Sequence, residues 1–307
     1  MHRLAILFLI ISHFITDFVT CAGWEYSGLH GPSNWSHIPG YEKCDGEAQS
    51  PISIPPAETV KYDSNLTPFI LNGFGGSSVY SRIFNNGHTA QLDILGDVTV
   101  EGGGLPQMHK TAQLHFHWGE TDDKGSEHIM YSMSYPLEMH IVNFNSKYGN
   151  LTQAVSQPDG LAVLGFFFKV SPNDNPDLTT FINHLTNIRY ADQEEMVIDV
   201  NLRKLVLSQL DRYFRYKGSL TTPPCYESVT WTVFEEAIPI SSLQLSKFRG
   251  LYEKINGTTD NHKLTNNFRP PLPLNSRQIY RSFIVNSANL CTFSFVLLLA
   301  AYFCQLF

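Results

Sequence analysis

Three histidines near the middle of the chain have spacings that suit a metal site. Residues 113–118 alternate between polar and apolar types, in the order Gln-Leu-His-Phe-His-Trp. Side chains of a β-strand alternate between its two faces, so His115 and His117 would share one face, about 6.7 Å apart along the backbone. Two imidazoles at that separation can converge on one ion. The pattern therefore predicts a strand that presents two metal ligands.

A second predicted strand, over residues 138–142, supplies the third histidine. Glu138, His140 and Val142 would share its face. Three neutral imidazoles and one water make a catalytic zinc site with an open fourth position, whereas closed structural sites usually use thiolates. Ligand histidines also need an acceptor for their second nitrogen, and Gln113 and Glu138 lie on suitable faces. An iron site of two histidines and a carboxylate is the open alternative.

The elements that position these residues are predicted to be mainly β-strands. Alternating or β-rich segments occur at residues 78–84, 89–95, 111–118, 137–144, 161–170 and 228–234. Helical patterns are few and short, and the clearest are at residues 176–185 and 241–252. No repeat, low-complexity run or linker interrupts the chain between its two ends. These features favour a single β-dominated domain with small peripheral helices.

The composition fits an ordinary globular protein and limits its partners. The 307 residues carry a net charge of -7, with 43% hydrophobic and 16% charged residues. So small a charged fraction argues against a disordered or coiled-coil chain. The acidic balance argues against nucleic acid as a partner.

The N-terminal end resembles a secretory signal peptide. Residues 4–15 are nearly all apolar, follow the pair His2-Arg3, and lead to small residues before Gly23. We therefore predict a cleaved signal peptide over residues 1–22. A membrane-spanning helix is the alternative, but the apolar run is short and interrupted by polar residues.

The C-terminal end resembles an attachment signal for a glycosylphosphatidylinositol (GPI) anchor. Residues 290–307 are largely apolar and uncharged, and no basic residue follows them, as one usually would after a spanning helix. Asn286 and Ser287 precede the run, and we predict that one of them receives the lipid while residues 287–307 are removed as a propeptide. The polar spacer is shorter than usual, which leaves the attachment residue open. A retained span and an anchorless chain are the alternatives.

The cysteines and sequons agree with export. Of five cysteines, Cys21 lies at the end of the signal and two lie in the tail, which leaves Cys44 and Cys225 in the domain. Two lone cysteines in an oxidising compartment are expected to pair, although two buried free thiols are the alternative. Four asparagines begin Asn-x-Ser/Thr triplets and are candidate glycosylation sites: Asn34, Asn65, Asn150 and Asn256.

Taken together, these motifs resemble the alpha-class carbonic anhydrases. The histidine stretches carry the likeness, together with Glu127-His128 and residues 219–224, Ser-Leu-Thr-Thr-Pro-Pro. Further landmarks follow in order: Trp24 to Tyr26, Gly31 to Trp35, Gln49 to Ile52, Asn86 to His88, Asp159 to Val163 and Asn267 to Pro270. The likeness covers about residues 23–282 and is greatest to the membrane-anchored, extracellular members. It implies a domain over residues 23–286 built around a large twisted, mostly antiparallel β-sheet.

The resemblance also implies roles for residues around the metal. His115, His117 and His140 match the zinc ligands. Thr221 matches the threonine whose hydroxyl donates to a buried carboxylate, here Glu127, and orients the attacking oxygen. Thr222 matches a residue that contacts bicarbonate through water. Four residues match the apolar wall where carbon dioxide rests: Val142, Val163, Leu220 and Trp231.

His88 matches the residue that shuttles protons to solvent. Its ordinary pKa, near about 6.5, suits proton transfer at neutral pH. A solvated turn histidine after Asn-Gly is the alternative. Tyr26, Asn86 and Gln91 match polar residues that order water in the cavity. Because Cys225 follows Pro223-Pro224, we further expect its bridge to brace the loop that holds Thr221.

The resemblance implies a zinc enzyme that reversibly hydrates carbon dioxide to bicarbonate and a proton at the outer face of the plasma membrane. Its partners would be carbon dioxide, water, bicarbonate and the membrane, with bicarbonate transporters as candidate protein partners. A non-catalytic binding ectodomain on the same fold is the alternative, and an adhesion or structural ectodomain is a further one. Binding relatives lose a zinc ligand, whereas this chain has all three histidines.

Overall fold

The computed structural model describes residues 23–76, 79–259 and 261–285. Its strands are β1 (Ser53–Ile54), β2 (Lys61–Tyr62), β3 (Phe69–Asn72), β4 (Ser81–Asn85), β5 (Ala90–Ile94), β6 (Thr99–Gly102), β7 (His109–Trp118), β8 (Ile129–Met130), β9 (Leu137–Asn145), β10 (Leu161–Ser171), β11 (Glu194–Val197), β12 (Tyr213–Gly218), β13 (Val229–Phe234), β14 (Ile238–Ser241) and β15 (Tyr280–Arg281). The α-helices are α1 (Leu151–Ala154), α2 (Thr179–His184) and α3 (Ser242–Phe248). Short 3₁₀ helices are η1 (Gly28–His30), η2 (Pro32–His37), η3 (Glu42–Asp45), η4 (Ala57–Thr59), η5 (Ser146–Tyr148), η6 (Pro176–Leu178), η7 (Leu185–Asn187) and η8 (Leu202–Leu205).

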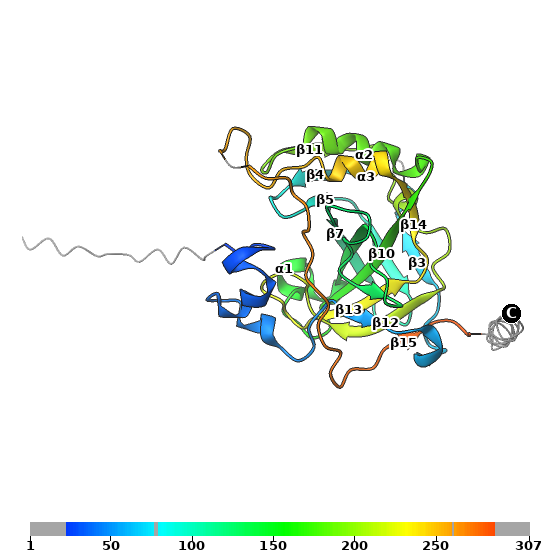
Figure 1. The fold of residues 1–307 in the computed structure, drawn as a ribbon. Coiled ribbons are helices and arrows are strands. Elements are labelled where there is room, and N and C mark those ends of the chain that lie inside the picture. Colours follow the sequence, from blue (N-terminus) through cyan, green and yellow to red (C-terminus); the bar gives the residue numbers. More distant parts are fainter. Residues whose placement is uncertain (1–22, 77–78, 260, 286–307) are drawn as a thin grey trace, which may run out of the picture.

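One large mixed sheet dominates these residues (Figure 1). Along its main path the strand order is β11-β4-β5-β7-β9-β10-β13-β12-β15-β2, and β3, β6 and β14 pair off this path. Most neighbours are antiparallel, while β10 pairs in parallel with β13 and β14, and β15 with β2. The prediction of a mainly β domain around a mostly antiparallel sheet is confirmed.

The six segments predicted as strands are strands, with ends within three residues of the predicted ones. The buried strand β12 is not among the predictions, because Arg215 and Lys217 interrupt its apolar pattern. In the fold, the Arg215 guanidinium is buried and donates to the Gly103 carbonyl and the Thr232 hydroxyl. Hydrogen bonds to distant residues therefore allow a cation to be buried in a strand, although its charge interrupts the apolar pattern of the sequence.

The predicted helices are shorter than expected. The prediction over residues 241–252 is wrong in extent, because α3 ends at Phe248. A capping box of Ser241 and Gln244 begins this helix. Beyond its end, Gly250 has low helix propensity, and the backbone N–H of Tyr252 donates to the carbonyl of Arg189 instead. The helix predicted over residues 176–185 is divided among η6, α2 and η7, since its outer turns tighten to 3₁₀ geometry.

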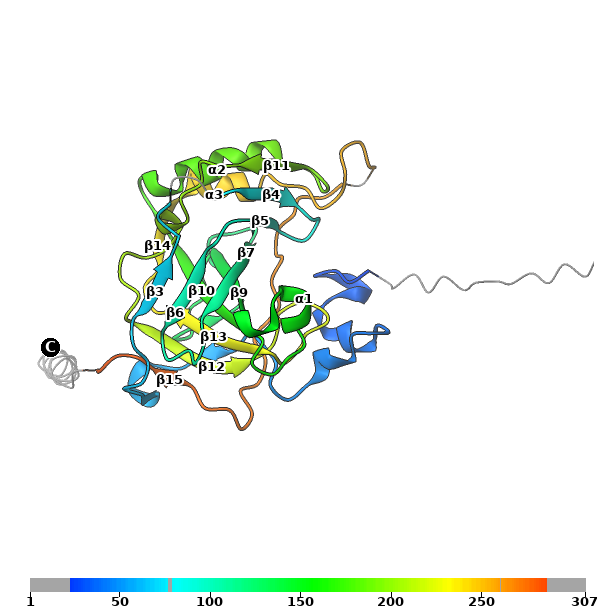
Figure 2. The same cartoon turned by 180° about the vertical axis from the view of Figure 1, so that it is seen from behind.

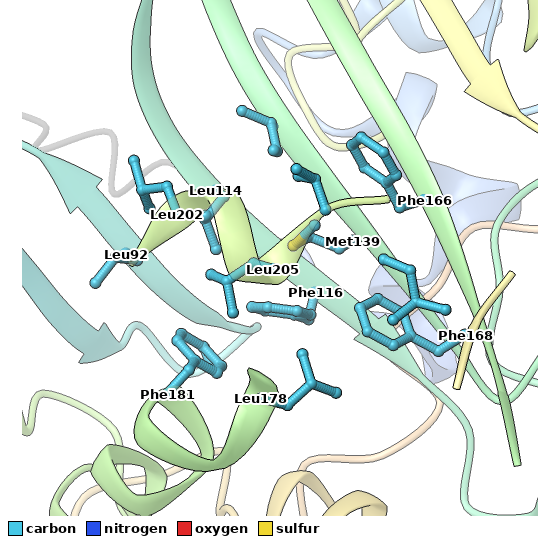
Figure 3. Packing of buried hydrophobic residues seen from close by; sticks show 14 of the residues in the cluster. Leu92, Leu114, Phe116, Met139, Phe166, Phe168, Leu178, Phe181, Leu202 and Leu205 are labelled. Atoms are coloured by element: carbon cyan, nitrogen blue, oxygen red, sulfur yellow. The ribbon is translucent and has the colours of Figure 1, made fainter. Parts of the chain in front are cut away.

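The face of β7 opposite the histidines packs into the larger hydrophobic core. Leu114, Phe116 and Trp118 belong to this core, as predicted from the alternation. α2 and α3 cover it (Figure 2). Phe181 of α2 contacts Phe116 (Figure 3), and Phe248 of α3 contacts Phe116 as well. Burying each such aromatic ring contributes about 2–3 kcal/mol, so this core holds β7 in a fixed position.

The register of β7 and β9 determines where the histidines meet. The two strands are antiparallel, and His115 lies directly opposite His140. Side chains of directly opposed residues lie on the same face of a sheet. A bulge between Thr111 and Gln113 lets this register continue along the strand. Three histidines that are 25 residues apart at most in sequence therefore share one face.

A disulfide connects the N-terminal segment to the loop after β12. Cys44 and Cys225 are bonded across a sequence separation of 181 residues. Both are buried in a small cluster with Trp35 and Ile38. The predicted pairing of these cysteines is confirmed, and it places the segment that is blue in Figure 1 against the loop of Thr221.

The predicted targeting segments fall outside the described residues. These are residues 1–22 at the N-terminus and 287–307 at the C-terminus, together with the candidate attachment residues Asn286 and Ser287. Among the residues that the structure describes, no helix is long and apolar enough to cross a membrane.

Candidate metal centre and active site

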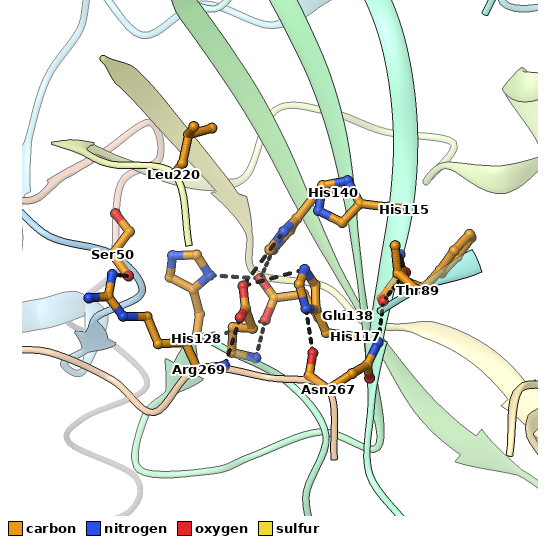
Figure 4. Close-up of polar contacts among 12 residues, drawn as sticks. Ser50, Thr89, His115, His117, His128, Glu138, His140, Leu220, Asn267 and Arg269 are labelled. Carbon is orange, nitrogen blue, oxygen red and sulfur yellow. Dashed lines mark hydrogen bonds and ion pairs between the residues drawn. The ribbon is translucent and has the colours of Figure 1, made fainter. Parts of the chain in front are cut away.

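Three imidazoles meet where β7 and β9 lie side by side (Figure 4). His115 and His117 project from β7, and His140 projects from β9. One ring nitrogen of each lies within 4.8 Å of the other two. The structure therefore brings together the three residues predicted as metal ligands.

An oxygen acceptor holds the outer nitrogen of each ring. The three bonds run from Nδ1 of His115 to Oε1 of Gln113 at 2.9 Å, from Nδ1 of His117 to the carbonyl of Asn267 at 2.8 Å, and from Nε2 of His140 to Oε1 of Glu138 at 2.8 Å. Since these oxygens only accept, each bonded nitrogen carries the proton and the other keeps its lone pair. The inward atoms are Nε2 of His115 and His117 and Nδ1 of His140.

The chemistry of these inward atoms fits a zinc ion. Burial lowers the pKa of His117 to about 3, and burial also lowers the pKa values of His115 and His140, so all three rings are neutral. Nε2 of His117 and Nδ1 of His140 are buried and have no hydrogen-bond partner among the described residues. Buried lone pairs without partners are costly. Three converging neutral imidazoles are the donor set of a catalytic zinc site.

Glu138 supports the site with both carboxylate oxygens. Oε2 accepts the backbone N–H groups of Glu127 and His128, each at 2.9 Å. Oε1 accepts from Nδ1 of His128 at 2.7 Å and from Nε2 of His140. Burial raises the pKa of Glu138, but the two imidazoles outweigh that effect and lower it. The carboxylate is therefore ionised and gives His140 a charged acceptor.

Glu127 lies beside the triad. Its Oε1 accepts the backbone N–H of Arg269 at 2.8 Å, while its Oε2 lies 3.4 Å from Nε2 of His117. Burial raises the pKa of the Glu127 carboxyl well above its ordinary value, and the N–H of Arg269 and the hydroxyl of Thr221 oppose that shift only in part. Thr221 is buried too. The fold thus brings the predicted carboxylate and hydroxyl to the metal centre.

The four residues of the predicted apolar wall belong to one hydrophobic cluster or pack against it. Val142, Val163 and Trp231 are buried in the second hydrophobic core, and Leu220 packs against it. The Trp231 ring lies 4.7 Å from the His140 ring, measured between centroids. The cluster therefore reaches the metal site at His140. The remaining predicted site residue on the 221–224 loop, Thr222, is half-buried and accepts the Cys225 N–H at its carbonyl.

His88 lies in the turn between β4 and β5 and lines a cavity of about 560 Å³, together with residues 25–27, 253–254 and 262–266. None of the three metal-site histidines is among the described residues that line this cavity. The His88 ring stacks on Trp24, with centroids 4.0 Å apart. Burial lowers the pKa of His88, and the nearby Glu25 opposes that shift. Tyr26 lines the same cavity, and burial raises its pKa so that the hydroxyl stays neutral. The stack on Trp24 has no signal in the alternation pattern, because the two residues lie on different elements.

The side chains of Asn86 and Gln91 form hydrogen bonds with other groups of the protein. Oδ1 of Asn86 accepts the backbone N–H groups of His88 and Thr89, each at 2.9 Å, which closes the turn. Nε2 of Gln91 donates to Asp93 at 2.7 Å, and Gln91 pairs with His115 in the sheet. Gln91 therefore lies on the histidine face, whereas Asn86 is exposed at the turn.

The candidate glycosylation sites are on the surface. Asn65, Asn150 and Asn256 are exposed, and Asn34 is half-buried in η2. Oδ1 of Asn150 also caps the first turn of α1. Three of the four sequons are thus accessible without rearrangement.

Comparison with known proteins agrees with this geometry. The family model described as eukaryotic-type carbonic anhydrase matches residues 30–283. The chain belongs to the eukaryotic-type carbonic anhydrase family. It is similar to the Mus musculus protein named Carbonic anhydrase 7, with 39% identity over 264 residues, 85% of this chain and 97% of the relative. The Homo sapiens protein of the same name is 38% identical over 265 residues, with the same coverage.

As a member of the carbonic anhydrase family, the chain is an enzyme of the carbonate dehydratase type. Sequence reasoning assigned no role to two residues that the fold places at this site. The Asn267 carbonyl orients His117, and Arg269 holds Glu127. Both lie in the stretch Asn-Phe-Arg-Pro, whose only signal is its likeness to a family landmark. Their contacts link residues about 150 positions apart, which spacing alone does not reveal.

Proposed function

We propose that this chain is a zinc-dependent enzyme that interconverts carbon dioxide and water with bicarbonate and a proton on the outside of the cell. The pair of buried, unpartnered nitrogens on His117 and His140 is the observation that supports this most directly. They face a third imidazole, His115, while every outer nitrogen is held by an acceptor.

His115, His117 and His140 would hold the zinc ion through Nε2, Nε2 and Nδ1. Bound there, zinc supplies a Lewis acid that makes water nucleophilic at neutral pH. The low pKa values of these histidines keep their lone pairs available, so the ligands need not lose protons on binding.

The surrounding residues orient the reactants. Glu127 accepts from the Arg269 backbone and from the Thr221 hydroxyl. With its own hydrogen directed at Glu127, the threonine oxygen can only accept a hydrogen bond from the attacking oxygen, which would direct that oxygen's lone pair. Carbon dioxide has no net charge and forms weak hydrogen bonds, which suits the apolar wall of Val142 and Trp231. Thr222, at the edge of this wall, would contact bicarbonate through water.

His88 would carry the excess proton from the metal site to solvent. It is half-buried beside a cavity that contains Tyr26 in its wall, and burial lowers its pKa because it disfavours the imidazolium. A group with a pKa near or below neutrality can accept a proton and release it rapidly.

Four sequence features support an extracellular, membrane-anchored form. They are the signal-like segment over residues 1–22, the apolar tail over 287–307, the sequons and the disulfide. Bicarbonate transporters in the same membrane are candidate partners, since they would move the product. Release of the protein from intact cells by a phospholipase that cleaves glycolipids tests the anchor, and retention on the membrane would contradict it.

The experiment that tests the activity combines metal analysis with turnover. We expect one zinc per folded chain and carbon dioxide hydration that a chelator abolishes. His140→Ala should lose both zinc and turnover, because the two remaining imidazoles leave the ion weakly held. Normal turnover in that variant would overturn the proposal, and zinc binding without turnover in the unmodified protein would identify a binding domain instead.

A further inference from the structure

Asn267 joins two parts of the molecule that the proposed reaction must keep at a fixed separation. Its main-chain carbonyl accepts Nδ1–H of His117, one of the metal ligands. Its side-chain amide donates from Nδ2 to the carbonyl of His88 at 2.9 Å and to the carbonyl of Phe116 at 3.0 Å. Oδ1 of the same amide accepts the backbone N–H of Trp118 at 2.7 Å.

The amide orientation follows from its partners. Two carbonyl oxygens can only accept and one N–H can only donate, so a single placement of Oδ1 and Nδ2 satisfies all three contacts. Asn267 is 0% exposed, so water cannot replace any partner that is lost. The amide therefore connects the His88 turn to the two backbone positions that flank His117 on β7. Figure 4 shows Asn267 beside His117 and Thr89.

The sheet itself does not provide this connection. β5 and β7 pair from Asp93 to Gln91, and the pairing stops before the turn. Beyond that point, Thr89 bonds to Phe116 through its hydroxyl, and the amide of Asn267 supplies the next contact, to His88 itself. Side-chain hydrogen bonds of Thr89 and Asn267 thus connect this turn to β7 beyond the last backbone pair of β5.

The consequence is a His88 backbone held on both sides. Its N–H donates to Oδ1 of Asn86 at 2.9 Å, and its carbonyl accepts from Asn267. The ring of His88 can rotate about its own bonds, but the turn that carries it is held at one distance from the metal ligands. Proton transfer through water depends steeply on such distances.

We propose that the side chain of Asn267 is a positioning residue for proton transfer: it sets the His88 turn against the strand of metal ligands. This inference rests on the proposed role of His88. It separates two functions of one residue, because the main-chain carbonyl orients His117 whatever the side chain is.

Asn267→Asp tests the proposal with almost no change in volume. The carboxylate keeps an acceptor for the Trp118 N–H, but it presents an oxygen to the carbonyls of His88 and Phe116, which repels both. We expect kcat in weak buffer to fall about tenfold, while kcat/KM changes less than twofold because the hydration step is untouched. Imidazole buffer should restore kcat, and zinc affinity should stay within about threefold because His117 keeps its carbonyl acceptor.

Asn143→Asp is the matched control. Asn143 is also 0% exposed, and its Nδ2 donates to two carbonyls, those of Ile141 and Ala162, each at 3.0 Å. Its Oδ1 accepts one hydroxyl, from Thr111. The chemical change and the loss of stability are therefore similar, but the contacts lie away from the turn. We expect kcat in weak buffer to stay at the parent value.

The outcomes distinguish this inference from the proposed function. If His88→Ala leaves kcat unchanged, the shuttle role fails and this inference fails with it. The other case is that His88→Ala lowers kcat while Asn267→Asp, folded and loaded with zinc, keeps the parent kcat. In that case only the role of Asn267 is overturned. Combining the two substitutions should cost no more kcat than His88→Ala alone. Should Asn267→Asp not fold, Asn267→Ser removes the same donor with less repulsion, and the same criteria apply to it.

Discussion

Arg269 connects Glu127, beside the histidine triad, to Cys44 of the disulfide. Its backbone N–H donates to Oε1 of Glu127 and its Nη2 donates to the Cys44 carbonyl, each at 2.8 Å. The residue is 2% exposed, and its guanidinium lies over the Trp35 ring. Because a buried cation needs acceptors, these contacts make the N-terminal segment part of the support for the site.

Replacing Arg269 should therefore cost stability more than chemistry. Arg269→Met removes a guanidinium that also donates to Gln49 and to the Ser50 carbonyl. We expect the free energy of unfolding to fall by about 3 kcal/mol, since buried acceptors lose their donors. The N–H that Glu127 uses belongs to the backbone and persists, so the folded variant should keep measurable turnover. Urea unfolding checks this, with the exposed Arg189→Met as control; an unchanged free energy would contradict the account.

Glu138→Gln should weaken the metal site although it changes one atom. Both oxygens of Glu138 accept two N–H groups each. A glutamine presents one oxygen and one NH₂ group, so its amide nitrogen must face a pair of donors. We expect zinc affinity to fall about 10–100-fold, measured by competition with a chromogenic chelator. Affinity equal to that of the unmodified protein would mean that His140 does not depend on this carboxylate.

Removing the disulfide should destabilise the protein and loosen the loop of Thr221. The bridge closes a separation of 181 residues. For a loop of that length we expect Cys44→Ser with Cys225→Ser to cost about 2–5 kcal/mol, through a larger entropy of the unfolded chain. Turnover should fall as well, because without the bridge the loop that holds Thr221 is no longer bonded to the N-terminal segment at Cys44. Thermal unfolding and a hydration assay on the double variant test the two effects. If both the unfolding temperature and the turnover are unchanged, the bridge does not brace the loop that holds Thr221.

His184 should make a pH-dependent contribution to stability. Its ring donates to Glu195 from Nδ1 and to Asp199 from Nε2, each at 2.9 Å, which requires the imidazolium. Burial lowers the pKa of His184, but the two carboxylates outweigh it and raise the pKa above its ordinary value. The contribution is thus full below the ordinary pKa and is lost as the pH rises through the raised one.

His184→Gln should therefore reduce stability at pH 5.5 and have less effect at pH 9. The side chain is partly exposed, so solvent screening limits the difference to about 0.5–1 kcal/mol. Urea unfolding at the two pH values measures it, with the exposed His37→Gln as the control. If the substitution lowered the free energy of unfolding more at pH 9 than at pH 5.5, it would contradict a stabilising role for the ion pairs of His184.

The sequence alone determined much of this protein's local structure. Because strand side chains alternate with a period of two, the order of residues 113–118 was enough to place His115 and His117 on one face and Phe116 in the core. The same reasoning located six of the strands within three residues and indicated acceptors for two of the three imidazoles, Gln113 and Glu138. These inferences succeed because the interacting residues are neighbours on one element.

The tertiary structure decided what lies between elements. That His115 faces His140 follows from the register of β7 and β9, which turns and core packing set together. The acceptor of His117 is a carbonyl 150 residues away, and the donor to Glu127 is 142 residues away. Backbone groups carry no side-chain signature, so no pattern in the sequence marks them. Only the folded chain brings them close enough to form hydrogen bonds.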